Sequence, residues 1–288
     1  MFEEDVKKRL EAIFPNQNIE IDHRLLGGMS NYTYVVKING EMFTYRIPGD
    51  NSDKFVDRSL EKENLKLVNQ LNISNQTVYF DLETGEKLAR YVDGQSVNLL
   101  QEYPYELISE SLKKIHNSRL KATNDYDPFA RLSYYEEHVK ELGFVHSKEY
   151  IDIKKKFFEY KEYLESQEKV LCHGDSQPSN FIYDGKEVYV VDFEFTGNND
   201  ICYDIACFAN VRLEEGLKLL EVYFNKPNQD QLKRFYLWRT FQCFQWYNVA
   251  TFKDLVGMSA SLKIDFKMVS DKYLALIYKL MDIIENKL

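Results

Sequence analysis

The chain has 288 residues, of which 44% are hydrophobic and 15% aromatic, so it is long enough to form one large domain or two modest ones with a substantial core. Its 37 basic and 46 acidic residues give a net charge of −9, which argues against nucleic acid and anionic membranes as partners. An acidic surface suits a cationic substrate, although such a charge balance more often serves solubility alone.

Cysteine usage and hydropathy indicate a reducing compartment and no membrane insertion. The four cysteines form no C-x-x-C pair and have no histidine at zinc-binding spacing: Cys172, Cys202, Cys207 and Cys243. No apolar run approaches the ~20 residues of a membrane span. The opening segment "MFEEDVKKRLEAIF" is too acidic for a signal peptide. We therefore expect a soluble, cytoplasmic protein.

The first ~90 residues predict a mixture of strands and helices. An apolar face made by Val6, Leu10, Ile13 and Phe14 predicts an opening helix that ends at Pro15. Three strand-like runs follow between residues 19 and 49, and Asn39-Gly40 predicts a type I′ hairpin between the second and third. The segment 53–71 has helical periodicity, and residues 77–81 and 86–92 predict two more strands.

From Tyr103 onward the pattern is mainly helical, with predicted helices at residues 105–117, 133–144 and 148–166 and further helices to the end. One segment of short β-type runs, residues 171–195, interrupts them. The sequence thus predicts an α+β fold of two lobes. The N-lobe, residues 1–92, would hold an antiparallel sheet of about five strands with a helix, and the C-lobe, residues 93–288, would be mainly helical.

The interrupting segment reads "LCHGDSQPSNFIYDGKEVYVVDFEF" and spaces three polar residues as protein kinases do: Asp175, Asn180 five residues later, and Asp192 at the end of a hydrophobic run. Phosphoryl transfer requires an aligned attacking oxygen and neutralisation of the charge on the γ-phosphate. Asp175 can accept the proton of a hydroxyl, while Asn180 and Asp192 offer the hard oxygen ligands that Mg²⁺ prefers. Alone, the spacing is weak evidence, because Asp175 and Asn180 also suit a turn beside Pro178.

Further elements of a phosphotransferase occur upstream in the expected order. "LLGGMSN", residues 25–31, is a glycine-containing turn able to bring backbone N–H groups against phosphates, or simply a hairpin. Arg46 on the third strand suits the cation that holds α- and β-phosphates, or an ordinary solvated cation. Glu61 on the next helix suits its acidic partner, with Glu63 as a rival. Together these features predict a kinase.

The sequence resembles the choline/ethanolamine kinase family, and within it the bacterial LicA-type choline kinases of the aminoglycoside-phosphotransferase and protein-kinase-like superfamily. The resemblance runs from about residue 27 to residue 206. It is carried by these segments: "GGMSN", "YRIPG", "RSLEKENLKLV", "RYVDG", "HGDSQPSN", "DFE" and "NNDICYDIA". It implies the two-lobed protein-kinase-like fold, with ATP and Mg²⁺ as cofactors.

Carried over residue by residue, the resemblance implies that Asp175 is the catalytic base facing the substrate hydroxyl. Asn180 and Asp192 would bind Mg²⁺, and Glu194 would be a further metal ligand or lie beside the ligands. Asp204 and His173 would be structural, fixing the catalytic loop. The nucleotide would meet a longer set: Gly28, Ser30, Asn31, Arg46, Glu61, Ala89 and Tyr91.

For the acceptor, the resemblance implies a small cationic amino alcohol, choline first, whose quaternary ammonium is recognised by aromatic faces. The segment "FYLWRTFQCFQWYNVATF" supplies several aromatic residues, and Trp246, Tyr247 and Phe244 are the predicted substrate contacts. Val211 stands where the family carries an acidic residue, so the cation site is weaker or balanced by another acid such as Glu214.

Other readings remain open from the sequence. The acceptor could be ethanolamine, thiamine or another amine, and the chain could be a catalytically idle protein that binds nucleotide or choline. The oligomeric state is also open, because the apolar faces of the late helices suit either a core or an interface.

Overall fold

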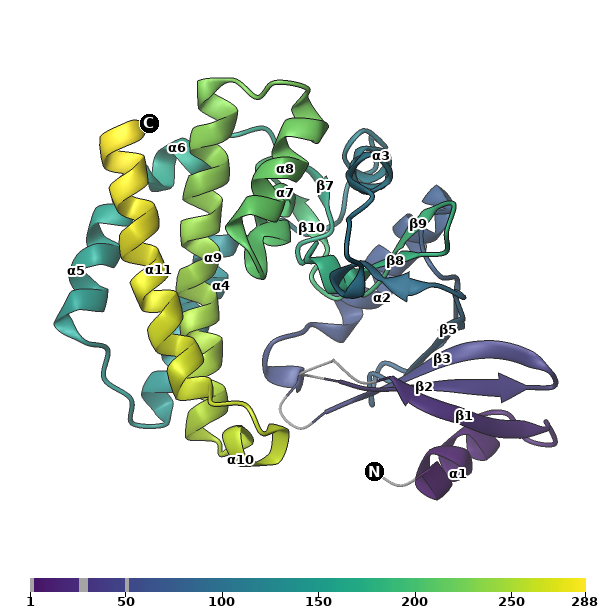
Figure 1. Ribbon diagram of the computed structural model, residues 1–288. Coiled ribbons are helices and arrows are strands. Elements are labelled where there is room, and N and C mark those ends of the chain that lie inside the picture. Colours follow the sequence, from purple (N-terminus) through teal and green to yellow (C-terminus); the bar gives the residue numbers. More distant parts are fainter. Residues whose placement is uncertain (1–2, 26–30, 50–51) are drawn as a thin grey trace. The chain divides into compact units, whose positions relative to one another are not determined.

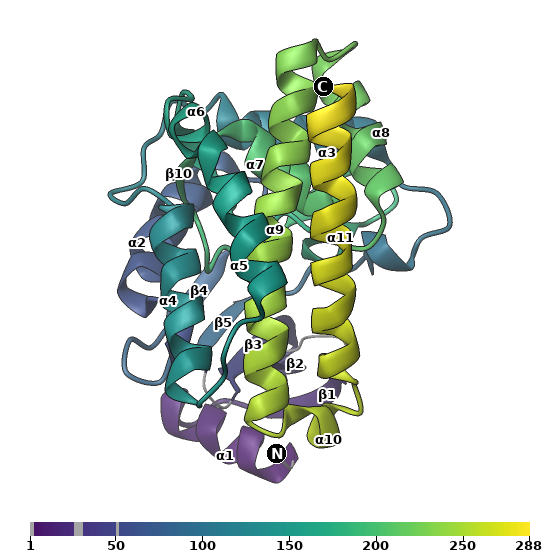
Figure 2. The same ribbon diagram turned by 90° about the vertical axis from the view of Figure 1, so that its left-hand side faces the viewer.

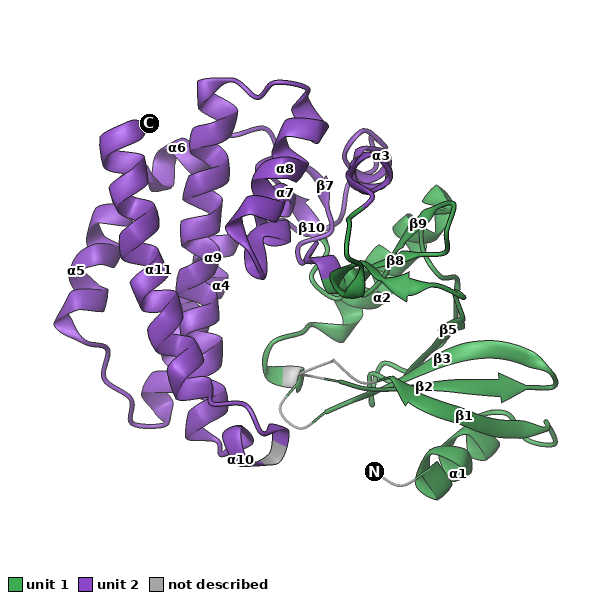
Figure 3. Cartoon of the chain, in the orientation of Figure 1, with its two compact units in different colours: residues 1–103, 179–196 green, residues 104–178, 197–288 purple. Residues whose placement is uncertain are grey.

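The computed structural model describes residues 3–25, 31–49 and 52–288. The chain forms two compact units: residues 1–103 with 179–196, and residues 104–178 with 197–288 (Figure 3). These bounds differ from the expected division at residue 92, since the first unit also takes in a later segment, residues 179–196. The division into a nucleotide-binding and a catalytic lobe stays a prediction.

The first unit contains the predicted antiparallel sheet of five strands, in the order β1-β2-β3-β5-β4. Figure 1 labels β1, β2, β3 and β5 of this sheet. The strands are β1 (Ile19–Leu25), β2 (Asn31–Ile38), β3 (Glu41–Pro48), β4 (Thr77–Phe80) and β5 (Lys87–Arg90). Ile38 pairs with Glu41 across the β2–β3 hairpin, so its loop has the two residues Asn39 and Gly40. Both have positive φ, 50° and 89°, which agrees with the predicted type I′ turn.

Helix α1 (Glu3–Ile13) covers one face of this sheet. Val6 and Leu10 are fully buried there, in one hydrophobic cluster with sheet residues that include Tyr34, Val36 and Tyr45. Full burial of such an aliphatic side chain contributes about 1.5–3 kcal/mol. The helical period read from the sequence therefore identified the correct packing face.

Helix α2 (Arg58–Val68) begins later than the predicted segment 53–71. The reason is local: Asp57 is the N-cap, and its side chain accepts hydrogen bonds from the backbone N–H groups of Ser59 and Leu60. Short 3₁₀ turns, Ser52–Lys54 and Asn69–Leu71, flank the helix. Its buried face carries Glu61 and Asn64 besides Leu65 and Val68, so polar groups are placed inside the unit.

A second sheet of the first unit presents the motif segment. Its strands, β6 (Gln95–Ser96), β8 (Phe181–Tyr183) and β9 (Val188–Val190), lie in the order β6-β8-β9 and are antiparallel. A 3₁₀ turn, Pro178–Asn180, leads into β8, and Val97–Leu99 forms another after β6. The N–H of Val190 donates to the carbonyl of Ile73, 2.8 Å away, which ties β9 to the chain before β4.

The second unit is mainly helical, as predicted. Its helices are α3 (Tyr105–His116), α4 (Pro128–Glu141), α5 (Lys148–Phe157), α6 (Lys161–Glu165), α7 (Ile201–Cys207), α8 (Leu213–Phe224), α9 (Gln229–Leu255), α10 (Met258–Leu262) and α11 (Phe266–Lys287). Short 3₁₀ turns, Phe158–Tyr160 and Phe208–Asn210, join some of them. β7 (Val170–Cys172) and β10 (Gly197–Asn199) form a two-stranded antiparallel sheet.

Helix α9 is the central element of this unit, with α11 alongside it in both views (Figures 1 and 2). It starts at a capping box made by Asn228 and Gln231. Phe241 is fully buried and packs edge-on against Phe129 of α4, with ring centroids 5.1 Å apart. Across the described residues, no helix combines the length and apolar character needed to cross a membrane.

Candidate active site

The loop that carries Asp175 follows β7 directly and is fixed by Asp204 of α7. The backbone N–H groups of His173 and Gly174 donate to the Asp204 carboxylate at 2.7 and 2.9 Å. Gly174 has φ +83°, a conformation that glycine adopts without steric cost. The N–H of Asp175 donates to Nδ1 of His173 at 3.1 Å. His173 and Asp204 therefore hold the loop, which agrees with the structural roles expected for them.

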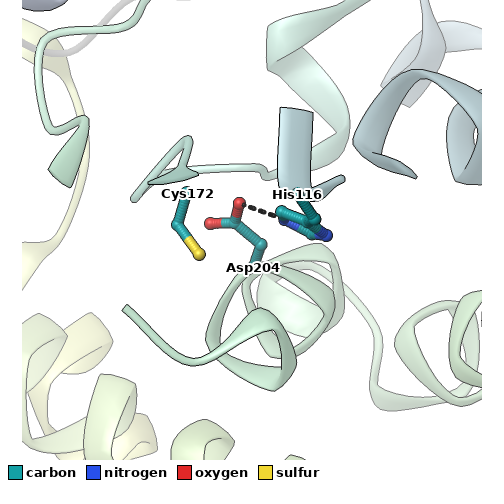
Figure 4. A group of neighbouring side chains, drawn as sticks. All are labelled: His116, Cys172 and Asp204. Carbon is teal, nitrogen blue, oxygen red and sulfur yellow. Dashed lines mark hydrogen bonds and ion pairs between the residues drawn. The ribbon is translucent and has the colours of Figure 1, made fainter. Parts of the chain in front are cut away.

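Asp204 is itself held by His116 of α3 (Figure 4). Nε2 of His116 lies 3.0 Å from Oδ2 of Asp204, and Nδ1 lies 2.8 Å from the hydroxyl of Tyr223. Burial opposes ionisation of Asp204, but the hydrogen bond and charge of His116 outweigh it and lower the pKa of the carboxyl. A buried carboxylate that accepts several hydrogen bonds is a rigid anchor for the loop.

Cys172 completes a buried group with His116 and Asp204 whose potential ligand atoms all lie within 4.8 Å of one another (Figure 4). The hydrogen bonds of this group argue for structure rather than metal binding. The thiol of Cys172 donates to the carbonyl of Asn199 at 3.4 Å, and burial raises the pKa of this thiol well above its usual value. A metal would require the thiolate.

The carboxylate of Asp175 is oriented by side chains of its own unit. Nε2 of Gln177 donates to Oδ2 of Asp175 at 3.0 Å, and Nδ2 of Asn210 donates to Oε1 of Gln177 at 3.1 Å. The Asp175 side chain thus comes from a braced loop and has a defined hydrogen-bond partner, as a general base needs.

The residues predicted to bind metal lie together in the first unit. The N–H of Val191 donates to the carbonyl of Asn180 at 2.9 Å, which ties the chain before β8 to the end of β9. Asp192 follows β9 with φ +68°, an uncommon left-handed conformation for a residue other than glycine. Strained backbone of this kind occurs often at functional sites. The side chain of Asp192 is 34% exposed, whereas that of Glu194 is 6% exposed.

The predicted partners Arg46 and Glu61 form a bidentate ion pair. Nη1 and Nη2 of Arg46 donate to the two carboxylate oxygens of Glu61 at 2.6 and 2.9 Å, and the Glu61 side chain is fully buried. Such a fork-to-fork pair is geometrically specific. The rival Glu63 lies exposed on the same helix.

This ion pair continues to the metal-binding group. Nη1 of Arg46 lies 3.7 Å from Oδ1 of Asp192 and 3.4 Å from Oε2 of Glu194. Arg58 bridges Glu61 and Glu194 at 2.8 and 3.1 Å, and Nζ of Lys87 lies 3.2 Å from Glu61. Three cations and three carboxylates therefore form one continuous network in the first unit.

Burial and the neighbouring charges shift the pKa values of several members of the network. Burial opposes ionisation of Glu61, but Lys87, Arg46 and Arg58 outweigh it and lower its pKa from 4.5 to about 2. Burial, followed by the charge of Arg46, lowers the pKa of Lys87. Burial, followed by the neighbouring negative charge of Asp192, raises the pKa of Glu194.

The donor set fits a magnesium ion. Asn180, Asp192 and Glu194 offer amide and carboxylate oxygens, the hard ligands that Mg²⁺ selects. The repulsion between Asp192 and Glu194 that raises the pKa of Glu194 is also what a divalent cation between such groups would relieve. These observations support the metal assignment, which stays a prediction.

The remaining nucleotide-binding predictions concern the five-stranded sheet. Asn31 is the first residue of β2 and lies opposite Pro48. Ala89 is buried in β5, and the N–H of Tyr91 just beyond it donates to the carbonyl of Met42 at 3.1 Å. Gly28 and Ser30 lie outside the described residues. Contact of these residues with a nucleotide remains a prediction.

The three predicted acceptor residues of α9 differ in accessibility. Trp246 is half-buried and stacks on Tyr273 of α11, with centroids 6.2 Å apart and an interplanar angle of 16°. Tyr247 is 5% exposed and stacks on Tyr150 at 4.8 Å. Phe244 is fully buried against Phe157, so its packing supports a core role rather than contact with an acceptor. Positions around a helix that point in different directions cannot all face one ligand.

Position 211, where the family resemblance predicts an acidic residue, carries Val211 in this chain. Val211 is 64% exposed, and Glu214, the acid considered as a substitute, is exposed too. Its neighbour Glu215 is buried and accepts from the hydroxyl of Tyr105, besides pairing with Arg212 at 2.8 Å. The structure therefore offers no support for Glu214 as a compensating charge.

Sequence reasoning missed Arg58, Lys87, Asn210 and Tyr273. Arg58 had a usable signal, because it lies three residues before Glu61 on a predicted helix, where side chains meet. Lys87 lies in the short strand β5, and no sequence pattern singled it out. The contact between Asn210 and Tyr273 joins residues 63 apart in sequence, which no local pattern reveals.

Three kinds of comparison identify similar proteins. Residues 23–214 match the family model described as choline/ethanolamine kinase. The protein LicA of Haemophilus influenzae is 25% identical over 213 residues, which is 71% of this chain and 63% of LicA, so the match spans less than two thirds of that relative.

Solved structures of two similar proteins share the fold. A choline/ethanolamine kinase family protein from Mesorhizobium loti has a TM-score of 0.78 at 20% identity, covering 98% of this chain and 95% of its own. Choline kinase LicA from Streptococcus pneumoniae has a TM-score of 0.73 at 21% identity, covering 94% and 98%. A LicA structure in complex with AMP gives the same TM-score, 0.73. The predicted kinase-like fold is confirmed.

Proposed function

The chain belongs to the choline/ethanolamine kinase family, and on that premise we propose that it transfers the γ-phosphate of ATP to the hydroxyl of a small cationic amino alcohol, most directly choline, giving phosphocholine and ADP. The observation that carries this proposal is the network in which the buried pair Arg46–Glu61 adjoins Asp192 and Glu194. It combines a fixed cation for phosphates with oxygen ligands for a metal, as phosphoryl transfer requires.

The roles of the residues follow from their environments. Asp175, held by the Asp204-anchored loop, accepts the proton of the acceptor hydroxyl and orients its oxygen. Arg46, oriented by Glu61, contacts the phosphates of the nucleotide. Asn180, Asp192 and Glu194 would hold Mg²⁺, which neutralises charge on the transferred phosphoryl group. The AMP-bound LicA structure supports a nucleotide site in this fold.

Choline is the proposed acceptor for two reasons: the chain belongs to the choline/ethanolamine kinase family, and α9 and α11 carry an aromatic surface made by Trp246 and Tyr273. The half-buried ring of Trp246 stacks beside Tyr273, and an aromatic face attracts a quaternary ammonium that has no N–H to donate. The net charge of −9 also favours a cationic substrate over an anionic one. We further propose a cytoplasmic location, in keeping with four cysteines that are all free.

Ethanolamine is the second candidate acceptor, and thiamine or another amine the third. The exposed Val211 leaves the cation site without the acidic residue expected there, which weakens the case for choline specifically. The family description names both choline and ethanolamine.

The test is a panel of acceptors in one ADP-release assay with ATP and Mg²⁺. We expect choline-dependent ADP release, formation of phosphocholine, and a loss of roughly 10²–10⁴-fold in the Asp175→Ala variant. Unchanged nucleotide affinity of Asp175→Ala would show that the variant lost chemistry rather than binding. If ethanolamine or thiamine is phosphorylated and choline is not, that amine replaces choline as the proposed acceptor. If no acceptor is phosphorylated, the result favours a catalytically idle binding protein.

A further inference from the structure

A chain of hydrogen bonds in the second unit connects the base Asp175 to α9 and α11. Gln177 donates to Asp175 at 3.0 Å and accepts from Nδ2 of Asn210 at 3.1 Å. Oδ1 of Asn210 in turn accepts from the hydroxyl of Tyr273 at 2.8 Å and from Nη2 of Arg239 at 3.4 Å. All five residues belong to the same compact unit.

The chain has one direction, which its two ends determine. The guanidinium of Arg239 can only donate, and the ionised carboxylate of Asp175 can only accept. Between them, the amide of Asn210 must present its oxygen to Arg239 and its NH₂ to Gln177. Gln177 must then present its NH₂ to Asp175. Reversing either amide would place two acceptors, or two donors, face to face.

The donor end is held firmly. Arg239 is 1% exposed and also lies 3.4 Å from Oε1 of the buried Gln242. Its guanidinium lies 5.9 Å from the ring centroid of Tyr273, a cation–π contact. Burial raises the pKa of Tyr273 to about 12, so its hydroxyl stays protonated and can donate at neutral pH. Two donors therefore fix the orientation of Asn210.

We propose that Asn210 is a positioning residue: anchored by Arg239 and Tyr273, it orients Gln177 so that Gln177 donates to one oxygen of Asp175 and sets the plane of the catalytic carboxylate. The inference rests on the proposed phosphotransfer, in which Asp175 must face the acceptor hydroxyl. Because Tyr273 also stacks on Trp246, the same chain ties the base to the aromatic surface assigned to the acceptor.

A double-mutant cycle tests the connection. Asn210→Ala and Gln177→Ala are each expected to lower kcat about tenfold, the size of one lost orienting hydrogen bond, with the KM for ATP unchanged. Because both act through the same contact, the double variant is expected to be no slower than Gln177→Ala. If the kcat loss of the double variant equals the product of the two single losses, the proposal is overturned.

Asn210→Asp tests the direction of the chain. It keeps the size of the side chain and the oxygen that accepts from Tyr273 and Arg239, but removes the donor to Gln177. We expect the kcat of Asn210→Asp to be as low as that of Asn210→Ala. A kcat near the wild-type value would show that Asn210 contributes only packing, which would contradict the proposal. Asn198→Ala is the matched control: it removes another half-buried amide of the same unit, one that bonds to the backbone of residues 122 and 124. It is expected to leave kcat within twofold of wild type.

Failure of the proposed function is separable from failure of this inference. The kinetic comparison uses whichever acceptor the wild type phosphorylates. Should the wild type phosphorylate none, crystal structures of the wild type and Asn210→Asp decide. The Gln177–Asp175 hydrogen bond is expected in the first and absent in the second. A carboxylate of Asp175 in the same place in both would overturn the inference.

Discussion

Glu61 shows how much a single residue depends on its neighbours. Its side chain is fully buried, and three cations hold it ionised: Arg46, Arg58 and Lys87. Removing one partner from a buried ionic network leaves uncompensated charges, which costs about 3–5 kcal/mol. Because Arg46 is the cation proposed to hold the phosphates, the same removal also disturbs the nucleotide site.

We predict that Glu61→Gln lowers the free energy of unfolding at pH 7 by about 3 kcal/mol or more, measured by urea denaturation. The pKa of Glu61 is lowered from 4.5 to about 2 in the folded protein, so its ionised form stabilises the fold above pH 4.5. That stabilisation is lost as the pH falls from 4.5 towards 2, and the difference between wild type and variant should shrink over this range.

Glu63→Gln is the control on the same helix, because Glu63 is exposed; we expect a change within about 0.5 kcal/mol. Equal effects of the two substitutions, or a wild-type–variant difference that does not depend on pH, would contradict the role assigned to Glu61.

At the scale of elements, the start of α2 decides where Glu61 lies. Asp57 accepts from the N–H groups of Ser59 and Leu60 at 2.9 and 3.1 Å, and the N–H of Glu61 donates to the carbonyl of Asp57 at 3.0 Å. The cap thus stabilises the first turn, and Glu61 belongs to that turn.

Asp57→Ala is expected to lower the free energy of unfolding by about 1 kcal/mol, because two N–H groups lose their acceptor. Asp57→Ser retains a capping oxygen and should recover most of the loss. Thermal unfolding of the three proteins measures their stability, which is expected to decrease from wild type to Asp57→Ser to Asp57→Ala. An Asp57→Ala variant as stable as wild type would show that the cap is dispensable.

Elements with local signals could be predicted from the sequence. The opening helix, the Asn39-Gly40 hairpin and the five-stranded sheet all appear, because periodicity and turn chemistry are properties of neighbouring residues. The two-residue strand β6 carries no pattern of its own and exists only through pairing with β8, more than 80 residues later. The start of α2 was misplaced because the helical periodicity was extended back to residue 53, whereas Asp57 caps the helix, which therefore begins at Arg58.

The candidate site divides in the same way. The spacing of Asp175, Asn180 and Asp192 is visible in the sequence, and the pairing of Arg46 with Glu61 followed from their order along the chain. The contacts of Arg239 and Tyr273 with Asn210 depend on how α9 and α11 pack, and composition gives no sign of them. Phe244 was chosen by its aromatic type, yet burial on α9 depends on the face it occupies.

For the whole molecule, binding of nucleotide should depend on the metal. A ligand that binds only the folded protein stabilises it, by about 2.7 kcal/mol at a hundredfold excess over Kd. We expect ATP to raise the melting temperature in the presence of Mg²⁺ and to do so much less after chelation, since Asn180, Asp192 and Glu194 are proposed to hold the ion that accompanies the nucleotide.

Asp192→Asn should lose most of the Mg²⁺-dependent part of this shift while keeping a similar melting temperature without ligand, because the Asp192 side chain is partly exposed. Equal stabilisation by ATP with and without Mg²⁺ in the wild type would instead favour a nucleotide-binding protein that does not use a metal.

The first compact unit is discontinuous in sequence, since it takes residues 179–196 from beyond the first part of the second unit. During synthesis on the ribosome, the opening 103 residues therefore emerge without β8 and β9, which pair with β6, and without the carboxylates of Asp192 and Glu194 that face Arg46. The buried cations of this nascent segment therefore meet these carboxylates only after residues 104–178 of the second unit have been translated, so the first unit cannot complete its ionic network as the opening 103 residues emerge.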